Sequence, residues 1–327
     1  MASDGGADAR RVPSGMRLRY LVTGCFGFVG SYLVDAIHRA RPDAEIIAIG
    51  RTAAPATFPA LTRTHVLDLL ELPALAKVIE RERPDRLVHL ASRSSVGLSW
   101  REPIASFTNN TNIFLNVLEC VRKHSPETRM LSIGSSEQYG LVTEADLPLR
   151  ETQSLRPLSP YAVARVAQEH LGDVYARGYG LDLVATRSFN HLGAGQSDQF
   201  VISAIAKQFA ERARGERDRL RVGTISVVRD FLDVRDVVTA YLALLERGVR
   251  GEVYNICSGR GVSIAETIAM LAEIAGVAPN IETDPALVRP IENLIVVGDH
   301  AKITAAVGWQ PTISLESALR SVYDYWR

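Results

Sequence analysis

A glycine-rich segment near the N-terminus, LVTGCFGFVGSYLV, restricts the fold of this chain more than any other part of the sequence. Its glycines stand between an apolar run typical of a strand and an apolar run typical of a helix. In such a unit the backbone can approach a pyrophosphate, which sits at the N-terminus of the helix. The sequence therefore predicts a turn that binds a nicotinamide dinucleotide, with a tight packing turn as the alternative. The predicted contacts are Gly24, Phe26, Gly27, Phe28, Val29 and Gly30.

Strand-like and helix-like segments alternate beyond this turn. Strands are predicted at 19–23, 45–49, 86–90, 129–132, 182–188 and 251–256. Helices are predicted at 30–39, 72–83, 104–123, 161–177, 200–214, 264–275 and 315–325. The alternation indicates βαβ units with right-handed crossovers, so we predict an α/β fold with a doubly wound parallel (Rossmann) sheet and a smaller α/β substrate-binding lobe.

The character of the chain changes twice along its length. Residues 1–16 are small and polar, which predicts a disordered leader. Residues 17–188 are predicted to form the cofactor-binding Rossmann domain. Residues 189–327 alternate less regularly, so we expect them to form mainly the substrate-binding lobe, with some segments returning to the Rossmann sheet.

Composition argues against several classes of protein. The 37 Lys and Arg residues balance 37 Asp and Glu residues, so no overall field attracts nucleic acid or an anionic membrane. No apolar run approaches the roughly 18 residues that span a bilayer, and the opening segment lacks the apolar core of a signal peptide. Cys25, Cys120 and Cys257 lack zinc-like spacing, which indicates buried, reduced thiols. We expect a cytoplasmic protein without a metal site.

The end of the second predicted strand, EIIAIG, bears on the choice of cofactor. An NAD site would usually offer an acidic residue to the adenosine ribose here, but the chain continues with Arg51. A guanidinium suits a 2′-phosphate, so NADP(H) is the preferred cofactor and NAD(H) the second candidate. The alternative is that Arg51 is a solvated loop cation. Asp68 either accepts a hydrogen bond from the adenine amine or caps the following helix.

Two further segments carry candidate catalytic residues. Tyr161 and Arg165 stand four residues apart in SPYAVARVAQEH, so on a helix they share one face. GSSEQYG places Ser135 and Glu137 after an apolar strand, at the carboxyl end where sites of open α/β sheets form. Together with TGxxGFxG, these pieces resemble the extended short-chain dehydrogenase/reductase family, in which a Ser or Thr precedes Tyr-x-x-x-Lys. The resemblance extends from Arg17 to Trp326.

This resemblance implies roles for the candidate residues. Tyr161 would act as acid or base on a sugar oxygen that Ser135 hydrogen-bonds. A tyrosine with a pKa of about 10 is a weak base at neutral pH, so a cation must stabilise its phenolate. That cation is Arg165 in place of the family's lysine, so the site either works with a guanidinium or has impaired activity. The resemblance adds the cofactor contacts Leu69, Leu90, Ala91, Ser92, Asn110, Tyr161 and Arg165.

Several segments resemble a narrower branch, the enzymes of GDP-sugars: HLASRSSV, GSSEQYG, RSFNHLGAGQ, VRDFLDVRDVVTAY, VYNICSG and RPIEN. A nucleoside diphosphate needs cations and backbone donors, which Arg229, Arg289 and the loop after Asn190 can supply. Glu292 can accept from the N1 and N2 donors of guanine. The expected substrate contacts are Ser94, Ser95, Ser135, Ser136, Glu137, Asn190, Val201, Arg229, Arg289 and Glu292.

One of these contacts has an ordinary structural alternative, and the histidine next to another is expected to have a structural role. Arg229 could instead form ordinary surface pairs with Asp230 and Asp233, which contribute little to stability. His191, beside Asn190, is expected to be structural.

The branch includes dehydratases, which could use Glu137 for proton transfer at C5 and C6, and reductases, in which Tyr161 would protonate the C4 oxygen. The segments GFVG, GRTAAP and SRSSV favour the reductases. The hypothesis is NADPH-dependent reduction of the C4 ketone of GDP-4-keto-6-deoxy-D-mannose to a GDP-6-deoxyhexose such as GDP-D-rhamnose. The alternatives are a GDP-mannose 4,6-dehydratase, a nucleotide-sugar 4-epimerase and, because of Arg165, a catalytically impaired NADP(H)-binding protein.

The helices predicted at 104–123 and 161–177 carry more apolar residues than one sheet face can cover: Phe107, Phe114, Val117, Leu171 and Val174. In the resembled family the corresponding helices pair into an intersubunit four-helix bundle, which implies a homodimer. Internal packing of these residues is the alternative.

Overall fold

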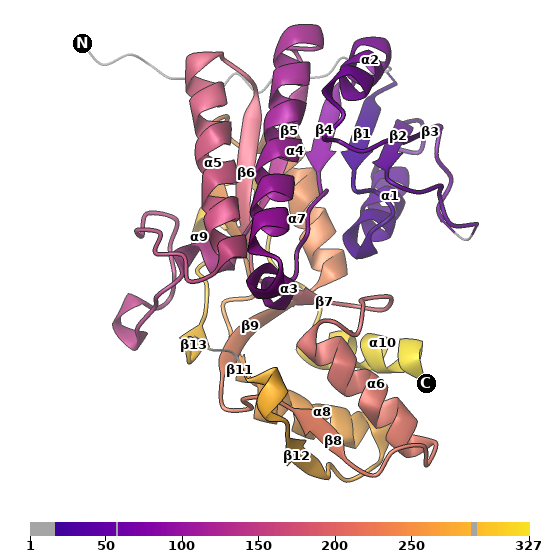
Figure 1. Cartoon of the computed structure of the whole chain (residues 1–327), viewed down its shortest axis with the longest axis vertical. Helices are drawn as coiled ribbons and strands as arrows, with labels where there is room; N and C mark the ends of the chain where they lie inside the picture. The colour runs from indigo at the N-terminus through magenta and orange to yellow at the C-terminus, as the bar shows by residue number, and fades with distance from the viewer. Residues whose placement is uncertain (1–16, 57, 289–292) are drawn as a thin grey trace.

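The computed structural model describes residues 17–56, 58–288 and 293–327. A parallel sheet with the strand order β10-β6-β5-β4-β1-β2-β3 forms its centre (Figure 1). Its strands are β1 Arg19–Thr23, β2 Glu45–Gly50, β3 Arg63–Val66, β4 Arg86–His89, β5 Arg129–Ser135, β6 Leu183–Ser188 and β10 Val253–Ile256. The predicted fold class is confirmed, whereas the predicted leader at 1–16 lies outside the described residues.

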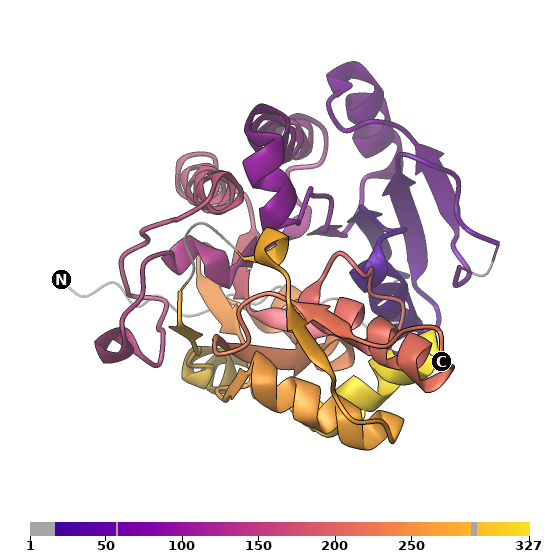
Figure 2. The same cartoon turned by 60° about the horizontal axis from the view of Figure 1, so that its bottom comes forward.

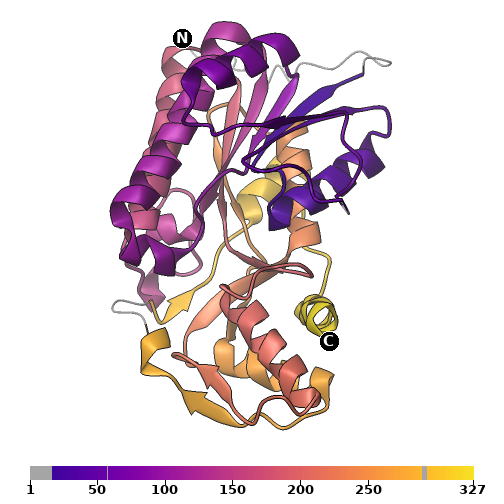
Figure 3. The same ribbon diagram turned by 45° about the vertical axis from the view of Figure 1, so that its right-hand side comes forward.

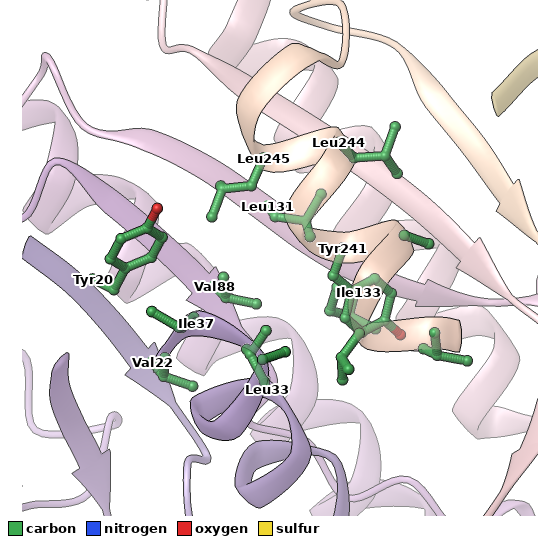
Figure 4. Close-up of a cluster of buried hydrophobic side chains, with 14 of the residues drawn as sticks. Tyr20, Val22, Leu33, Ile37, Val88, Leu131, Ile133, Tyr241, Leu244 and Leu245 are labelled. Carbon is green, nitrogen blue, oxygen red and sulfur yellow. The ribbon is translucent and has the colours of Figure 1, made fainter. Parts of the chain in front are cut away.

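Helices cover both faces of this sheet, as a doubly wound fold requires. One face carries α1 Phe28–Ala40, α7 Val234–Arg247 and α9 Ala301–Val307. The other carries α2 Leu72–Glu82, α4 Pro103–His124 and α5 Pro160–Gly178. Because strand side chains alternate, Val22 packs under α1 and α7 while its neighbour Leu21 packs on the opposite face. Figure 4 shows the first of these cores, where Leu33 of α1 and Tyr241 of α7 meet the sheet.

A smaller lobe lies beyond the carboxyl ends of the strands (Figures 2 and 3). Its helices are α6 Val201–Ala213, α8 Ile264–Ala275 and α10 Leu315–Trp326. Its strands are β7 Asn190–Leu192, β8 Leu220–Val222, β9 Val228–Asp233, β11 Gly261–Ser263, β12 Ile281–Thr283 and β13 Ile295–Val296. Phe209, Leu271 and Leu319 are fully buried in its separate core. Between these segments the chain returns to the large sheet, where α7 packs and β10 pairs with β6.

Most predicted helices and strands are found near their predicted positions, and the bounds of β1 and α8 equal the predicted ones. Helix α7 is absent from the predictions, although the side chain of Asp233 caps it by accepting from the Arg235 N–H at 2.8 Å. Strand β3 is also absent from them, because it is a four-residue strand at the sheet edge with little burial. Cys25, Cys120 and Cys257 are buried free thiols, as predicted.

The prediction about the apolar residues of α4 and α5 was wrong for two of them. Phe114 and Val117 are fully buried against the sheet, so they need no further partner. Leu171 packs at the edge of the same core. Phe107 and Val174 remain exposed. In the part of the chain that the structure describes, every helix is too short or too polar to cross a membrane.

Candidate active site

The glycine turn between β1 and α1 leaves no room for side chains at two positions. Gly24 has a φ of 66°, and a Cβ there would lie 2.7 Å from the Ala91 backbone. A Cβ on Gly30 would lie 1.8 Å from the Cys25 carbonyl oxygen, so Gly30 lets α1 pack closely on the turn. Gly27 precedes α1 and offers no side-chain cap. The open N–H groups of α1 therefore fit the pyrophosphate of a dinucleotide.

The end of β2 forms the next part of the candidate cofactor site. The ring of Phe26 packs over Gly50, where a Cβ would lie only 2.3 Å from the ring, and meets Phe58 edge-on at 5.1 Å. Arg51 follows and is exposed, and its guanidinium forms no hydrogen bond or ion pair within the described residues. A guanidinium that no protein group engages fits a phosphate of the cofactor.

Asp68 and Leu69 lie in the loop between β3 and α2. The Asp68 carboxylate accepts from the Leu70 N–H at 2.9 Å, while Glu71 is the N-cap of α2. The alternative reading of Asp68 as the helix cap is therefore wrong. Leu69 is buried, and its carbonyl accepts from the Asn116 amide at 2.9 Å, which ties this loop to α4.

The loop after β4 carries Leu90, Ala91 and Ser92, and Asn110 of α4 fixes its shape. The Asn110 amide is buried, accepting from the Arg93 N–H at 2.8 Å and donating to the Arg93 carbonyl at 3.1 Å. Leu90 donates its N–H to the carbonyl of Thr23, the last residue of β1. The loop is thereby held beside the glycine turn, where Ala91 touches Gly24.

Tyr161 and Arg165 meet on α5, as their spacing predicts. Ser159 caps this helix by accepting from the Ala162 N–H at 3.1 Å, and Pro160 occupies its first turn. Both Tyr161 and Arg165 are buried. The Arg165 Nε donates to the Tyr161 hydroxyl at 3.1 Å, and the guanidinium carbon lies 5.2 Å from the centre of the phenol ring.

The positive charge of Arg165 faces no competing charge that the structure describes. No carboxylate within the described residues forms an ion pair with it. Its titratable neighbours on other elements are His89 of β4 and Tyr241 of α7. Burial, followed by the charge of Arg165, lowers the pKa of His89 to about 3. Burial raises the pKa of Tyr241, so both are neutral at pH 7. The buried cation is therefore available to stabilise a phenolate at Tyr161.

Ser135 and Glu137 lie at the carboxyl end of β5. The Ser135 hydroxyl accepts from the Glu137 N–H at 3.3 Å, while the Gln138 side chain accepts from the Ser135 N–H at 2.8 Å. This capping box starts the 3-10 helix η1 Ser136–Tyr139, which turns the chain into the cleft between sheet and lobe.

Four of the predicted substrate contacts line this cleft: Ser136, Glu137, Asn190 and Arg229. The cleft has further lining residues that the sequence did not predict. They lie on α3 Val96–Arg101, in the loop after η1, just before α5, and in the segment that includes β13: Val96, Trp100, Gly140, Val142, Leu158, Ser159, Asn293 and Val296. The lining therefore combines polar side chains with apolar ones such as Val96 and Trp100. No local sequence pattern indicates this, because α3 and β13 Ile295–Val296 meet only in the fold.

The residues that line the cleft do not include four other predicted substrate contacts: Ser94, Ser95, Ser135 and Val201. Ser95 caps α3 by accepting from the Leu98 N–H at 3.2 Å, and Ser94 next to it is exposed. Val201 begins α6 and is exposed. Arg289 and Glu292 lie outside the described residues.

Arg229 does not pair with Asp230 or Asp233, so the alternative of ordinary surface pairs with these aspartates is wrong. It is buried, and its Nη1 donates to the carbonyls of Val228 and Asn293, both at 2.9 Å. Asp233 pairs instead with Arg235 at 2.7 Å, and Asp230 accepts from the backbone N–H groups of Ser258, Gly259 and Gly298. Arg229 is thus held at the cleft, where a cation can meet an anionic substrate.

His191 is structural, as predicted. Its Nδ1 lies 3.1 Å from the Phe189 carbonyl oxygen, and its ring stacks on Phe28 with 6.2 Å between the centres. Burial lowers the pKa of His191, so the ring is neutral at pH 7.

Known proteins resemble this chain along almost its whole length. A family model described as GDP-mannose 4,6 dehydratase matches residues 21–322. The GDP-6-deoxy-D-mannose reductase of Pseudomonas aeruginosa is 38% identical over 312 residues, which are 95% of this chain and 98% of that protein. The solved structure of RMD from Pseudomonas aeruginosa complexed with NADPH has a TM-score of 0.84 at 37% identity, covering 94% of this chain and 98% of that one.

The fold also matches an enzyme of another reaction type. The UDP-glucose 4-epimerase of Thermus thermophilus, solved in complex with NAD, has a TM-score of 0.85 at 29% identity. The match covers 94% of this chain and 99% of the epimerase. The shared architecture therefore extends over the Rossmann sheet and the lobe in both cases.

Proposed function

The chain belongs to the GDP-mannose 4,6-dehydratase family, and from this premise we propose an NADPH-dependent reductase of a GDP-4-keto-6-deoxy sugar. The family confirms the predicted resemblance to extended short-chain dehydrogenases/reductases acting on nucleotide sugars, so the chain is an enzyme of that type. The proposed reaction converts the C4 ketone of GDP-4-keto-6-deoxy-D-mannose into the hydroxyl of a GDP-6-deoxyhexose such as GDP-D-rhamnose. The observation that carries it is the Tyr161 hydroxyl, 3.1 Å from a buried guanidinium, in a chain 38% identical to a GDP-6-deoxy-D-mannose reductase.

Each catalytic residue has one task in this proposal. NADPH supplies the hydride that C4 accepts. Tyr161 donates its proton to the oxygen that was the ketone, and Arg165 stabilises the phenolate that remains. Ser135 donates a hydrogen bond to the same sugar oxygen. The geometry of Arg165 supports this division of tasks, because the guanidinium keeps the charge that a lysine would supply and lies in contact with the phenol.

The cofactor preference follows from the end of β2. Arg51 offers an exposed guanidinium where the 2′-phosphate of NADP(H) would lie, and the similar structure from Pseudomonas aeruginosa is complexed with NADPH. NAD(H) is the second candidate, since the similar epimerase is complexed with NAD. We assign residues 17–188 mainly to the cofactor and residues 189–327 mainly to the substrate.

The substrate assignment rests on the polar residues that line the cleft. Arg229 is the cation for the diphosphate, and Asn190 lies on the same cleft. Arg289 and Glu292 keep their sequence-based assignment to the GDP part. A GDP-mannose 4,6-dehydratase is the second candidate, because Glu137 also lines the cleft and provides a carboxylate for proton transfer at C5 and C6.

One set of incubations tests the proposed function. The purified chain is mixed with NADPH and GDP-4-keto-6-deoxy-D-mannose, and NADPH absorbance is followed before NMR identifies the product. We expect NADPH to disappear and a GDP-6-deoxyhexose to form. Incubation with GDP-mannose and catalytic NADP⁺ is the counter-test, since accumulation of the 4-keto-6-deoxy sugar would establish a dehydratase. Copurifying cofactor with no net NADPH consumption would establish an epimerase.

We also propose a homodimer that pairs α4 and α5 with the same helices of a second copy. Exposed apolar side chains lie on the two helices, among them Ile104 with 82% of its surface exposed and Val174 with 56%. Phe107 and Val163 are exposed as well. Four helices would bury them as a bundle. Sedimentation should give a dimer for the wild type and a monomer for Val174→Glu, and a monomeric wild type would refute the pairing.

A further inference from the structure

Gln168 connects the catalytic arginine to the central sheet. It lies three residues beyond Arg165 on α5 and is 1% exposed. Its Oε1 accepts from Arg165 Nη1 at 2.5 Å. Its Nε2 donates to the Ser132 hydroxyl at 2.8 Å and to the Ile133 carbonyl at 3.1 Å, both on β5. Every polar atom of this amide is therefore engaged.

The hydrogen-bond partners settle the orientation of the amide. The Ile133 carbonyl oxygen can only accept, so the side of Gln168 that faces it must be the NH₂ group. The carbonyl side of Gln168 then faces the guanidinium of Arg165, which can only donate. A flipped amide would set donor against donor and acceptor against acceptor. Gln168 thus presents one fixed acceptor to Arg165.

Two of the three side-chain nitrogens of Arg165 have hydrogen-bond partners within the described residues. Nε donates to the Tyr161 hydroxyl at 3.1 Å, and Nη1 donates to the Ile133 carbonyl at 3.0 Å and to Gln168. Nη2 has no hydrogen-bond partner within the described residues, and it is not among the fully buried atoms left unsatisfied. Because the guanidinium is planar, fixing Nη1 also fixes the directions of Nε and Nη2.

We propose that Gln168 is a positioning residue of the proton-transfer site, which orients the guanidinium of Arg165 so that Nε stays on Tyr161 and Nη2 stays available to a bound ligand. The inference rests on the proposed function and deepens it. The ammonium of a lysine is a compact charge whose donors rotate, so it needs no residue to orient it. The guanidinium of an arginine is planar, with its donors in fixed directions, and must be oriented. Gln168 is therefore the residue that lets an arginine work where the resembled family carries a lysine.

Ionisation of Tyr161 tests the proposal without any substrate. It is measured as the difference in ultraviolet absorbance between an enzyme and its Tyr161→Phe counterpart across a pH titration. Gln168→Met keeps the length of the side chain and removes the amide, so we expect the Tyr161 midpoint to rise by at least one pH unit. Among the residues that the structure describes, Arg165 is the one charged group in contact with the phenol, and its neighbours His89 and Tyr241 are neutral near pH 7.

The matched control is Gln208→Met on α6. Gln208 also uses both ends of its amide, donating to the carbonyl of Arg221 and accepting from its N–H, but it lies in the smaller lobe, away from α5. It should leave the midpoint of Tyr161 unchanged. Should Gln168→Met fail to fold, as judged by its melting temperature, Gln168→Asn shortens the amide by one methylene and carries the same expectation. An unchanged midpoint in a folded Gln168 variant would overturn the proposal.

A kinetic cycle provides the second readout. Gln168→Met should lower kcat at least tenfold in the wild-type background. In an Arg165→Lys background it should lower kcat less than twofold, because no planar guanidinium is left to orient. Equal losses in both backgrounds would mean a merely structural role and would overturn the proposal. A wild type that reduces no GDP-keto sugar would refute the proposed function, yet the titration of Tyr161 would still decide the role of Gln168.

Discussion

Gly30→Ala is the sharpest test of the cofactor turn. The added methyl group would lie 1.8 Å from the Cys25 carbonyl oxygen and 2.5 Å from its carbon, well inside the 3.0 Å limit that real Cβ atoms keep. Both contacts are to backbone, which cannot rotate away as a side chain would. The turn and the N-terminus of α1 must therefore separate, and the N–H groups that we propose for the pyrophosphate move with them.

Two opposing terms set the size of the effect. Alanine is favoured over glycine inside a helix by about 1 kcal/mol, whereas an overpacked site costs about 1–3 kcal/mol. The net loss of stability is therefore about 0–2 kcal/mol. The loss of one hydrogen bond to a charged group is worth about 1.5–3 kcal/mol. Since about 1.4 kcal/mol is a tenfold change in affinity, the Kd for NADPH should rise at least about tenfold.

Fluorescence titration with NADPH and thermal unfolding, each with Gly178→Ala as control, measure these two quantities. Gly178 ends α5, and a Cβ there would meet nothing within 4 Å. The control should bind NADPH as the wild type does and melt at the same temperature or slightly higher. If Gly30→Ala keeps the wild-type Kd, the turn between β1 and α1 does not hold the pyrophosphate and the reasoning from its geometry is refuted.

Four further predictions test other parts of the molecule. Arg51→Glu should shift the ratio of KM values toward NADH at least about tenfold, because a carboxylate repels the 2′-phosphate; an unchanged ratio would exclude Arg51 from the site. Tyr161→Phe should lower kcat by about 10²–10⁴-fold while NADPH fluorescence shows unaltered binding, and retained turnover would show that another group moves the proton. Burial raises the pKa of the Cys25 thiol to about 12, so a thiol reagent at pH 8 should modify it in urea but not in the native protein; equal rates would contradict its burial. Hydrogen bonds from Arg122 first, then Tyr175, lower the pKa of Glu119 to about 2, below its ordinary 4.5. The stability that Glu119 supplies is thus complete above pH 4.5 and lost as the pH falls toward 2, so Glu119→Gln should melt below the wild type at pH 7 and together with it near pH 2.

Local patterns predicted the large elements of the fold and missed the small ones. Strand β1 and helix α8 have long apolar patterns bounded by glycine or a capping serine, and both were predicted to the residue. Strands β12 and β13 have three and two residues, and their partners β8 and β9 lie about 60 residues away in the chain. Their extended shape comes from those distant partners, so no window of sequence contains the information.

The candidate site likewise has features that the sequence predicts and features that it does not. The pairing of Tyr161 with Arg165 follows from a spacing of four on one helix, which a sequence shows directly. The burial of Arg229 does not follow from any local spacing, because it depends on the carbonyl of Asn293, which is distant in the chain. The neighbouring aspartates suggested surface ion pairs instead. The alternative of Asp68 as a helix cap was wrong for a similar reason, because the sequence does not show that Glu71 takes the capping position of α2.

The arrangement of the site explains how one architecture serves several nucleotide sugars. Tyr161 and Arg165, which we propose for proton transfer, and the positioning residue Gln168 all lie on α5. Arg165 and Gln168 hydrogen-bond to β5, so the group depends on one helix and one strand. The cleft wall is built from α3, η1, β9 and β13, which come from both halves of the chain. Substitutions in the cleft wall can therefore alter the sugar that is bound without displacing the phenol or its cation. The similarity of this chain both to a reductase named for a GDP-sugar and to an epimerase named for a UDP-sugar fits such independence of recognition from proton transfer.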